Sequence, residues 1–233
     1  MMYPFPIAGF LPLSLVDFPG TEAAVLFTQG CNLRCPFCHN ADLIPVQAEK
    51  MDWSTVRERL LARRDLVDAV VITGGEPTLH AGLLPVLREL HQEKFCLKLD
   101  TNGTLPNVLQ TVLSENLVDF VAMDVKAPFD QRMDSATGTK NMALRIRTSL
   151  GLLKASTIPW EVRTTFHAGI DSQALHDIAK DIGNVPIWAW QACRSTPQYT
   201  APQYAPGWIT EQRDAFSNDP NIRLRGWSLP NEK

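Results

Sequence analysis

Residues 23–40 read AAVLFTQGCNLRCPFCHN, a short apolar run that leads directly into a loop with three cysteines. Cys31, Cys35 and Cys38 have the spacing C-x3-C-x2-C. Three thiolates on one short loop can each bind one corner of a cubic iron–sulfur cluster, and the lack of a fourth cysteine leaves one iron open to another molecule. The stretch therefore predicts a buried strand over 23–28 that ends in a reactive metal site.

The same loop allows a second interpretation, a zinc site. Cys31, Cys35, Cys38 and His39 would form a Cys3His ligand set, as in structural zinc modules. Adjacent ligands such as Cys38 and His39 suit a tetrahedral ion poorly, and modules of this kind usually stabilise small domains. A zinc-stabilised binding module is therefore the alternative hypothesis from a different class of protein.

Composition and charge exclude several kinds of partner. The 233 residues are 45% hydrophobic and carry a net charge of −3, with no basic run that would bind nucleic acid or an anionic membrane. The chain has no Lys or Arg before Arg34 and no long apolar stretch, so we expect neither a signal peptide nor a membrane span. Five cysteines, three of them on one loop, suit a metal site in a reducing compartment better than disulfides. We expect a cytoplasmic protein.

Short apolar runs alternate with longer segments of helical period, which is typical of parallel strands joined by crossover helices. The expected strands are 23–28, 69–73, 95–101, 120–125, 160–166 and 185–191. The expected helices are 53–64, 83–93, 107–115, 142–155 and 172–182, with Ser54, Asp171 and Ser172 as candidate N-caps. Six units are too few for a complete eight-stranded barrel. We therefore expect an α/β fold, a partial, open (β/α)6 barrel with outer helices, with a doubly wound sheet as the alternative.

We expect a single domain over residues 1–233, with a lead-in over 1–22. Pro197, Pro202 and Pro206 punctuate the chain after Ser195, so we expect an irregular extension over 195–233 that wraps the surface or covers an opening. A final helix over 211–217 and a short apolar piece over 222–224 would close the structure.

Polar residues follow the predicted strands at the points where each strand ends. The carboxyl ends of parallel strands meet at one rim, so we expect these side chains to surround a polar ligand. The candidates are Gly74, Gly75, Glu76, Asp100, Thr101, Asn102, Asp124, Lys126 and Arg163. Each also has a structural interpretation: the glycines as a tight turn, Asp100 to Asn102 as an Asx turn, and Asp124 with Lys126 as an ion pair.

Two motifs resemble the signatures of the radical S-adenosylmethionine superfamily. They are the cysteine loop, with Phe37 before its last cysteine, and Gly-Gly-Glu-Pro at 74–77. The stretches LVDFPG at 15–20, FTQGCN at 27–32 and CHN at 38–40 resemble the activating enzymes of glycyl radical enzymes, above all those of anaerobic ribonucleoside-triphosphate reductases. The resemblance is strong over 9–126 and faint beyond, and the chain lacks the extra cysteines of activases with an inserted ferredoxin-like domain.

This resemblance implies a radical oxidoreductase. Cys31, Cys35 and Cys38 would hold a 4Fe-4S cluster, and its open iron would bind the amino and carboxylate groups of S-adenosylmethionine. An electron from a flavodoxin- or ferredoxin-like donor would cleave that molecule, and the 5′-deoxyadenosyl radical would take a hydrogen atom from a backbone glycine of a partner glycyl radical enzyme. The role of the protein would be to position the cofactor, without a general base.

The resemblance also implies a role for each strand-end residue. Gly74, Gly75 and Glu76 would hold the methionyl amino group, and Phe37 would lie near the adenine. The remaining strand-end residues would surround the carboxylate group of S-adenosylmethionine, some of them through a bound monovalent cation. Of these residues, Lys126 would be catalytic together with the three cysteines. This second group is Asp100, Thr101, Asn102, Asp124, Lys126 and Arg163.

A radical enzyme that acts on a small molecule, such as a deazapurine-forming synthase, would carry the same motifs. An activase needs a groove wide enough for a peptide, whereas a synthase needs a closed pocket with dedicated polar contacts. The shape of the site therefore separates the two hypotheses.

Overall fold

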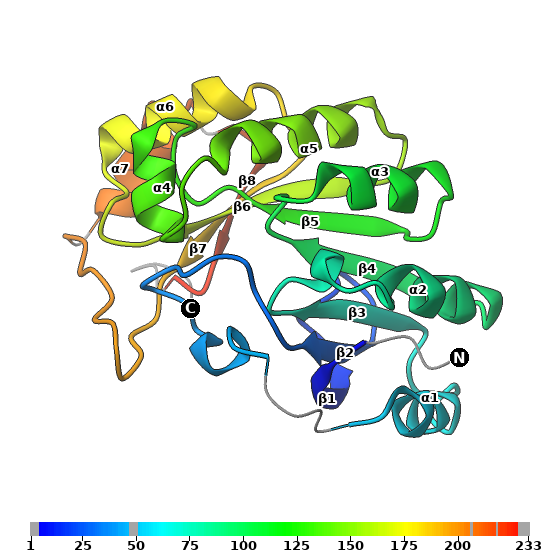
Figure 1. Ribbon diagram of the computed structural model, residues 1–233. Coiled ribbons are helices and arrows are strands. Elements are labelled where there is room, and N and C mark those ends of the chain that lie inside the picture. Colours follow the sequence, from blue (N-terminus) through cyan, green and yellow to red (C-terminus); the bar gives the residue numbers. More distant parts are fainter. Residues whose placement is uncertain (1–4, 47–50, 206, 218, 228–233) are drawn as a thin grey trace.

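Eight strands form one sheet whose order, β1 to β8, follows the order of the chain (Figure 1). The computed structural model describes residues 5–46, 51–205, 207–217 and 219–227. The strands are β1 (Ile7–Ser14), β2 (Ala23–Thr28), β3 (Ala69–Gly74), β4 (Cys96–Thr101), β5 (Phe120–Asp124), β6 (Trp160–Phe166), β7 (Trp188–Ala192) and β8 (Ile222–Arg225). From β2 to β8 all neighbours pair in parallel, and the strand order has no reversal, which excludes the doubly wound alternative.

Helices lie along the outside of this sheet (Figure 1). They are α1 (Trp53–Leu61), α2 (Leu83–Gln92), α3 (Pro106–Ser114), α4 (Gln131–Thr137), α5 (Ala143–Ala155), α6 (Ser172–Ile182) and α7 (Trp208–Ala215), with short 3-10 turns η1 (Ala41–Leu43) and η2 (Pro77–Leu79). In the described residues β1 and β8 are the two ends of the strand order, so the sheet is an open barrel, as predicted. Of the helices in the described ranges, none has the length and apolar character to cross a membrane.

The six predicted β/α units are all present, and the bounds of β2, β6 and α6 are those predicted. β7 begins at Trp188 and not at Val185, because Pro186 has no N–H to donate to a neighbouring strand. Ser54 is not the N-cap of α1, since Asp52 accepts the hydrogen bond from the Ser54 backbone N–H. Asp171 is the N-cap of α6, as predicted.

Two further strands extend the sheet beyond the six. β1 lies in the expected lead-in and pairs antiparallel with β2, although Gly9 and Pro12 interrupt its alternation. An edge strand tolerates proline, and the register shifts beside these residues. At the other end α7 and β8 lie in the expected irregular extension, and β8 adds a parallel strand to β7. Residues 1–4, Pro206 and 228–233 lie outside the described residues.

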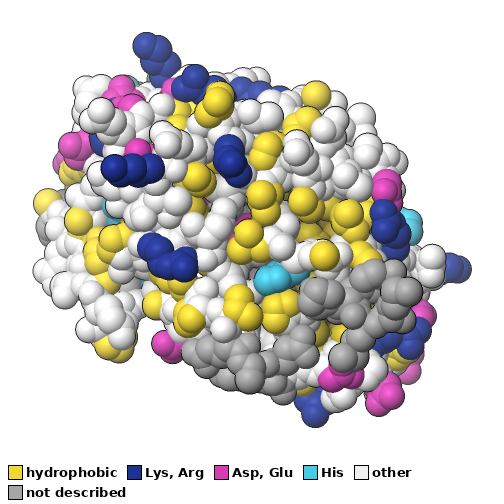
Figure 2. Space-filling model, viewed as in Figure 1, with side chains coloured by type: hydrophobic (Ala, Val, Ile, Leu, Met, Phe, Trp, Pro, Cys, Tyr) yellow, Lys and Arg dark blue, Asp and Glu magenta, His cyan; other side chains and the backbone are white. Residues whose placement is uncertain are grey.

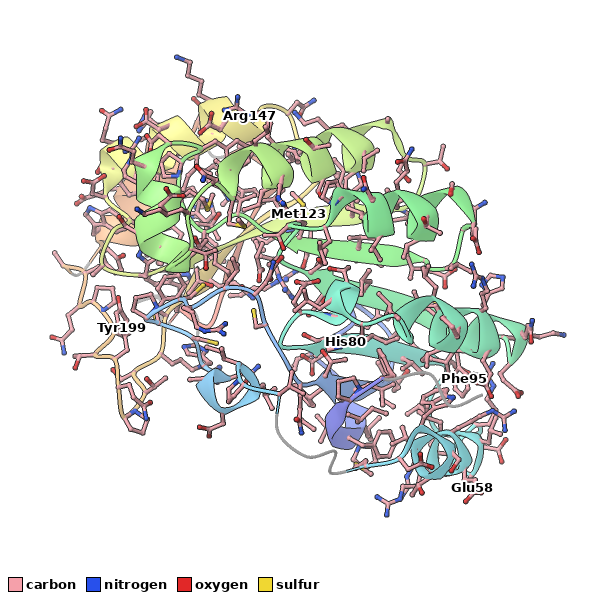
Figure 3. All side chains as sticks on the ribbon, in the orientation of Figure 1. Glu58, His80, Phe95, Met123, Arg147 and Tyr199 are labelled. Atoms are coloured by element: carbon pink, nitrogen blue, oxygen red, sulfur yellow. The ribbon has the colours of Figure 1, made fainter. Side chains whose placement is uncertain are left out.

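Alternate strand residues face two different cores. On β3, Val70 and Ile72 belong to the large core between sheet and helices, where Met123 of β5 also lies, at the centre of Figure 3. Ala69 and Val71 belong to a smaller cluster on the opposite face, inside the barrel. The next residue on this inner face is Thr73. The side chains inside the barrel therefore change from apolar to polar toward the carboxyl ends of the strands.

We expect Asp171→Ala to lower the free energy of unfolding by about 1 kcal/mol, because Asp171 Oδ1 accepts the Ala174 N–H at 2.7 Å at the start of α6. Denaturation in urea measures the loss. Asp171→Asn keeps an oxygen at the same place and should restore most of the stability. Equal losses in both variants would contradict the capping role.

Candidate active site

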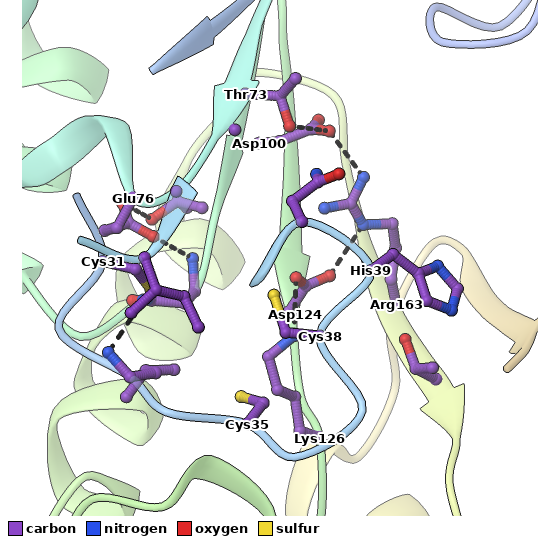
Figure 4. Close-up of a pocket in the computed structure, with 18 of the residues that line it drawn as sticks. Cys31, Cys35, Cys38, His39, Thr73, Glu76, Asp100, Asp124, Lys126 and Arg163 are labelled. Carbon is purple, nitrogen blue, oxygen red and sulfur yellow. Dashed lines mark hydrogen bonds and ion pairs between the residues drawn. The ribbon is translucent and has the colours of Figure 1, made fainter. Parts of the chain in front are cut away.

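One pocket at the rim of the barrel is lined by every residue that the sequence put forward for a site (Figure 4). Its volume is about 240 Å³. These residues are Cys31, Cys35, Phe37, Cys38, Gly74, Gly75, Glu76, Asp100, Thr101, Asn102, Asp124, Lys126 and Arg163. The structure thus brings the predicted residues together, while the group that each of them binds stays a prediction.

The cysteine loop is fixed by backbone hydrogen bonds on both of its sides. On one side the Gly30 N–H donates to the Leu43 carbonyl at 2.7 Å, in the turn η1. On the other the Arg34 N–H donates to the Thr137 carbonyl at 2.7 Å, at the end of α4. Hydrogen bonds to the backbone of η1 and of α4 therefore hold the loop on both sides.

Helix α4 was not predicted, although it supports this loop. Asp130 caps its first turn by accepting from the Arg132 N–H at 2.8 Å, and Gly138 ends it with a φ of 62°. A Cβ at Gly138 would lie 2.5 Å from the Arg34 carbonyl oxygen, so this position also needs glycine for space. An Asp followed eight residues later by Gly is a helix signal that would have located α4.

The two glycines after β3 allow close contact with the stem of the cysteine loop. A Cβ at Gly74 would lie 2.3 Å from the Thr28 nitrogen, and one at Gly75 would lie 2.1 Å from the Gly30 oxygen. Two backbone hydrogen bonds join the segments there, from Gly75 N–H to Thr28 O and from Glu76 N–H to Gly30 O. The glycines are therefore required for this backbone packing, while their contact with the methionyl group stays a prediction.

Glu76 is fully buried and connects the ends of two strands. Its carboxylate accepts hydrogen bonds from the Thr78 N–H at 3.0 Å, the Thr101 hydroxyl at 2.7 Å and the Asn102 N–H at 2.6 Å. Burial raises the pKa of Glu76, and these donated bonds oppose the shift. The side chain thus fixes the turn after β4, in addition to any contact with a ligand.

The turn after β4 also contacts the first cysteine of the loop, Cys31. Asn102 Nδ2 donates to Asn32 Oδ1 at 3.0 Å and lies 3.9 Å from Cys31 Sγ, and the Leu33 N–H donates to the same sulfur at 3.4 Å. N–H donors near a ligand sulfur tune the reduction potential of an iron–sulfur cluster.

The three cysteines fit a metal cluster in the chemistry of their donor set. They lie on one loop, line one pocket and are free thiols (Figure 4). Burial raises the pKa of Cys31, and it raises the pKa of Cys35 to about 11, so both are protonated until a metal displaces the protons.

The contacts of His39 argue against the alternative hypothesis of a Cys3His zinc site. His39 Nε2 lies 3.0 Å from the Arg194 oxygen and 2.9 Å from the Arg194 nitrogen, so it contacts the backbone after β7 and is not directed at the cysteines. Within the described ranges, no group of three or more His, Cys, Asp or Glu side chains is placed to hold a single metal ion.

Charged side chains on three neighbouring strands form a continuous ladder across the pocket (Figure 4). Arg163 on β6 bridges the two acids, with Nη1 at 2.8 Å from Asp100 Oδ2 and Nε at 2.8 Å from Asp124 Oδ1. Lys126 Nζ lies 3.0 Å from Asp124 Oδ2, and Lys98, which was not predicted, lies 2.8 Å from Asp100 Oδ1. Burial alone would raise the pKa of Asp124, but Arg163 and Lys126 outweigh it and lower the pKa to about 2.

Phe37 is buried in an aromatic group beside the last cysteine. Its ring stacks on His167, with centroids 4.2 Å apart and planes 4° apart, and it meets the edge of Tyr199 at 6.1 Å. Tyr199, at the left of Figure 3, comes from the proline-rich segment after β7. This segment therefore packs against the cysteine loop, as a cover of the opening would.

Comparisons with known proteins agree with this site. The sequence profile described as "Radical SAM superfamily" matches residues 25–182. The chain is 35% identical over 195 residues to a Methanocaldococcus jannaschii protein named "Putative glycyl-radical enzyme activating enzyme", covering 79% of this chain and 78% of that protein. It is 34% identical over 86 residues to the 7-carboxy-7-deazaguanine synthase of Aquifex aeolicus, covering 37% of this chain and 38% of that one.

Among solved structures, QueE from Escherichia coli has the same fold, with a TM-score of 0.55 over 96% of this chain and 94% of that chain. At 19% identity this similarity shows the fold alone. The superfamily profile, by contrast, spans more than half of the chain and includes the cysteine loop and the strand ends that line the pocket. The chain therefore belongs to the radical SAM superfamily and is an enzyme of radical S-adenosylmethionine chemistry.

Proposed function

We propose that the protein activates a glycyl radical enzyme, with an anaerobic ribonucleotide reductase as its partner. It would cleave S-adenosylmethionine at a 4Fe-4S cluster on Cys31, Cys35 and Cys38 and take a hydrogen atom from a backbone glycine of the partner. The observation that carries the proposal is the similarity to the Methanocaldococcus jannaschii protein named "Putative glycyl-radical enzyme activating enzyme", which extends over most of both chains.

The shape of the site supports a polypeptide substrate. A second cavity of about 370 Å³ adjoins the pocket, and the two share Cys38 and His39. Residues 194–198 of the tail also line this second cavity. Figure 2 shows hydrophobic side chains across the middle of the face seen in Figure 1. Two adjoining cavities suit an extended glycine loop better than one closed pocket does.

The residues of this chain would position the cofactor. When bound, the cluster supplies the electron that cleaves the sulfonium. Lys126 and Arg163 present positive charge where the carboxylate of the methionyl group would lie, and both are held by Asp124. Phe37, buried against His167, keeps water from one side of the cysteine loop.

The electron donor and the compartment are part of the same proposal. The reduced cluster requires a one-electron donor, for which we propose a flavodoxin- or ferredoxin-like protein. All five cysteines are free, which suits a protein of the reducing cytoplasm.

A second candidate is a radical enzyme with a small-molecule substrate. The local similarity to the deazaguanine synthase favours it, and this similarity covers little more than a third of the chain. Such an enzyme would form product from a nucleobase-like substrate without any protein partner.

The test is anaerobic reconstitution with iron and sulfide, reduction, and addition of S-adenosylmethionine together with an anaerobic ribonucleotide reductase. We expect an electron paramagnetic resonance signal of a glycine-centred radical on the reductase. The control is the same reductase with its radical glycine replaced by alanine. Formation of 5′-deoxyadenosine without a glycine signal on this reductase or on other glycyl radical enzymes would reject the activase and favour the second candidate.

A further inference from the structure

A buried ammonium group lies directly beneath the proposed cofactor site. Lys98 is on β4, two residues before Asp100 and therefore on the same inner face, and only 3% of its side chain is exposed. Its Nζ lies 2.8 Å from Asp100 Oδ1 and donates to the Asp17 carbonyl at 2.7 Å. Burial of such a charge costs desolvation free energy, which these two contacts offset.

The ladder of charged side chains carries one more positive charge than negative charges. Lys98, Arg163 and Lys126 carry three positive charges, while Asp100 and Asp124 carry two negative ones. Each of the four carboxylate oxygens has a cationic nitrogen within 3.0 Å. Asp100 Oδ2 also accepts from the Thr73 hydroxyl at 3.1 Å.

This arrangement does not fit the monovalent cation that the resemblance implied. Sodium or potassium would need oxygen ligands and negative surroundings, but a cationic nitrogen already lies within 3.0 Å of each carboxylate oxygen and the ladder has a net charge of +1. Burial alone would raise the pKa of Asp100, but Arg163 and Lys98 outweigh it and lower this pKa, so the acid stays ionised beside its cations.

We propose that Lys98 is a built-in substitute for the metal cation. Its ammonium neutralises Asp100 from below, which leaves the positive end of the ladder, Arg163 and Lys126, to pair with the carboxylate of S-adenosylmethionine without sodium or potassium. Lys98 is thus a positioning residue, and the inference rests on the proposed binding of S-adenosylmethionine in this pocket.

The first test uses the wild-type protein loaded with its cluster. The dissociation constant for S-adenosylmethionine is measured by anaerobic calorimetry in about 100 mM tetramethylammonium chloride and again in potassium or sodium chloride at equal ionic strength. We expect the constants to agree within about twofold, because no metal ion takes part. Binding that requires potassium or sodium would overturn the inference and leave the proposed function intact. Absence of binding in every buffer would overturn both.

The second test removes the ammonium. Lys98→Met keeps most of the aliphatic length of the side chain but removes the Nζ atom and leaves Asp100 without its counter-charge from below. We expect binding in tetramethylammonium to weaken about tenfold or more, and potassium or sodium to restore it by entering the vacated place. The double variant Lys98→Met/Asp100→Asn has no excess charge there and should not respond to the metal ion.

A matched control is Lys154→Met, which removes an exposed lysine at the end of α5 and should behave as wild type in all buffers. If Lys98→Met binds equally well with and without potassium or sodium, the inference is wrong. Should that variant fail to fold, the ion response of the wild-type protein still decides the question.

Discussion

Cys35→Ala is expected to eliminate both the iron–sulfur cluster and the cleavage of S-adenosylmethionine. Cys35 lines the pocket, next to Asp124 and Lys126, and its thiol is buried enough that its pKa rises to about 11. Loss of one of three protein ligands should reduce activity by more than about 100-fold, since loss of a group that only orients a metal ligand already costs 10- to 100-fold. The measurements are bound iron and sulfide and the yield of 5′-deoxyadenosine.

Cys96→Ala is the matched control for this experiment. Cys96 is also a free, partly buried thiol, but it begins β4, at the end of the strand opposite Thr101 and the rim. Its replacement should leave the cluster and the cleavage unchanged. If Cys35→Ala retained the cluster while its circular dichroism matched wild type, the assignment of the cysteine loop would be wrong.

The second large effect is expected for Gly75→Ala. The added Cβ would lie 2.1 Å from the Gly30 oxygen and 2.7 Å from the Gly30 carbonyl carbon, and both are backbone atoms that cannot turn aside. The stem of the cysteine loop must shift, and the Glu76 to Gly30 hydrogen bond at 2.8 Å is lost with it. We expect a loss of stability on the order of 2 to 4 kcal/mol and a lower cluster content.

Gly151→Ala separates this steric effect from the general effect of removing a glycine. Gly151 lies on the exposed side of α5, and a Cβ there would meet nothing within 4 Å. In a helix this change should stabilise by roughly 0.5 to 1 kcal/mol. Thermal unfolding followed by circular dichroism compares the two variants. Equal stability would contradict the close packing at Gly75.

Most of the barrel could be predicted from the sequence, because its signals are local and repeated. Each parallel strand is a short apolar run, and each run ends in polar residues, so the alternation predicted the six units and the rim where Asp100, Asp124 and Arg163 meet. Parallel strands place their carboxyl ends at one edge, which is why residues far apart in the sequence line one pocket.

The parts that were missed depend on tertiary contacts or on helix caps, which apolar periodicity does not reveal. β1 contains Gly9 and Pro12 and becomes a strand by pairing with β2 at the edge of the sheet. Helix α4 has too few apolar residues for a clear period and is stabilised by its caps and the cysteine loop. Lys98 was not put forward as a site residue, and one of its partners, the Asp17 carbonyl, lies 81 residues away, so no local pattern signals this contact.

The most direct test of the site is to measure, on the protein reconstituted without oxygen, both the metal that it binds and the 5′-deoxyadenosine that it forms. A cluster on Cys31, Cys35 and Cys38 predicts about four irons per chain and reductive formation of 5′-deoxyadenosine. Bound zinc, with no cleavage of S-adenosylmethionine after reduction, would contradict it.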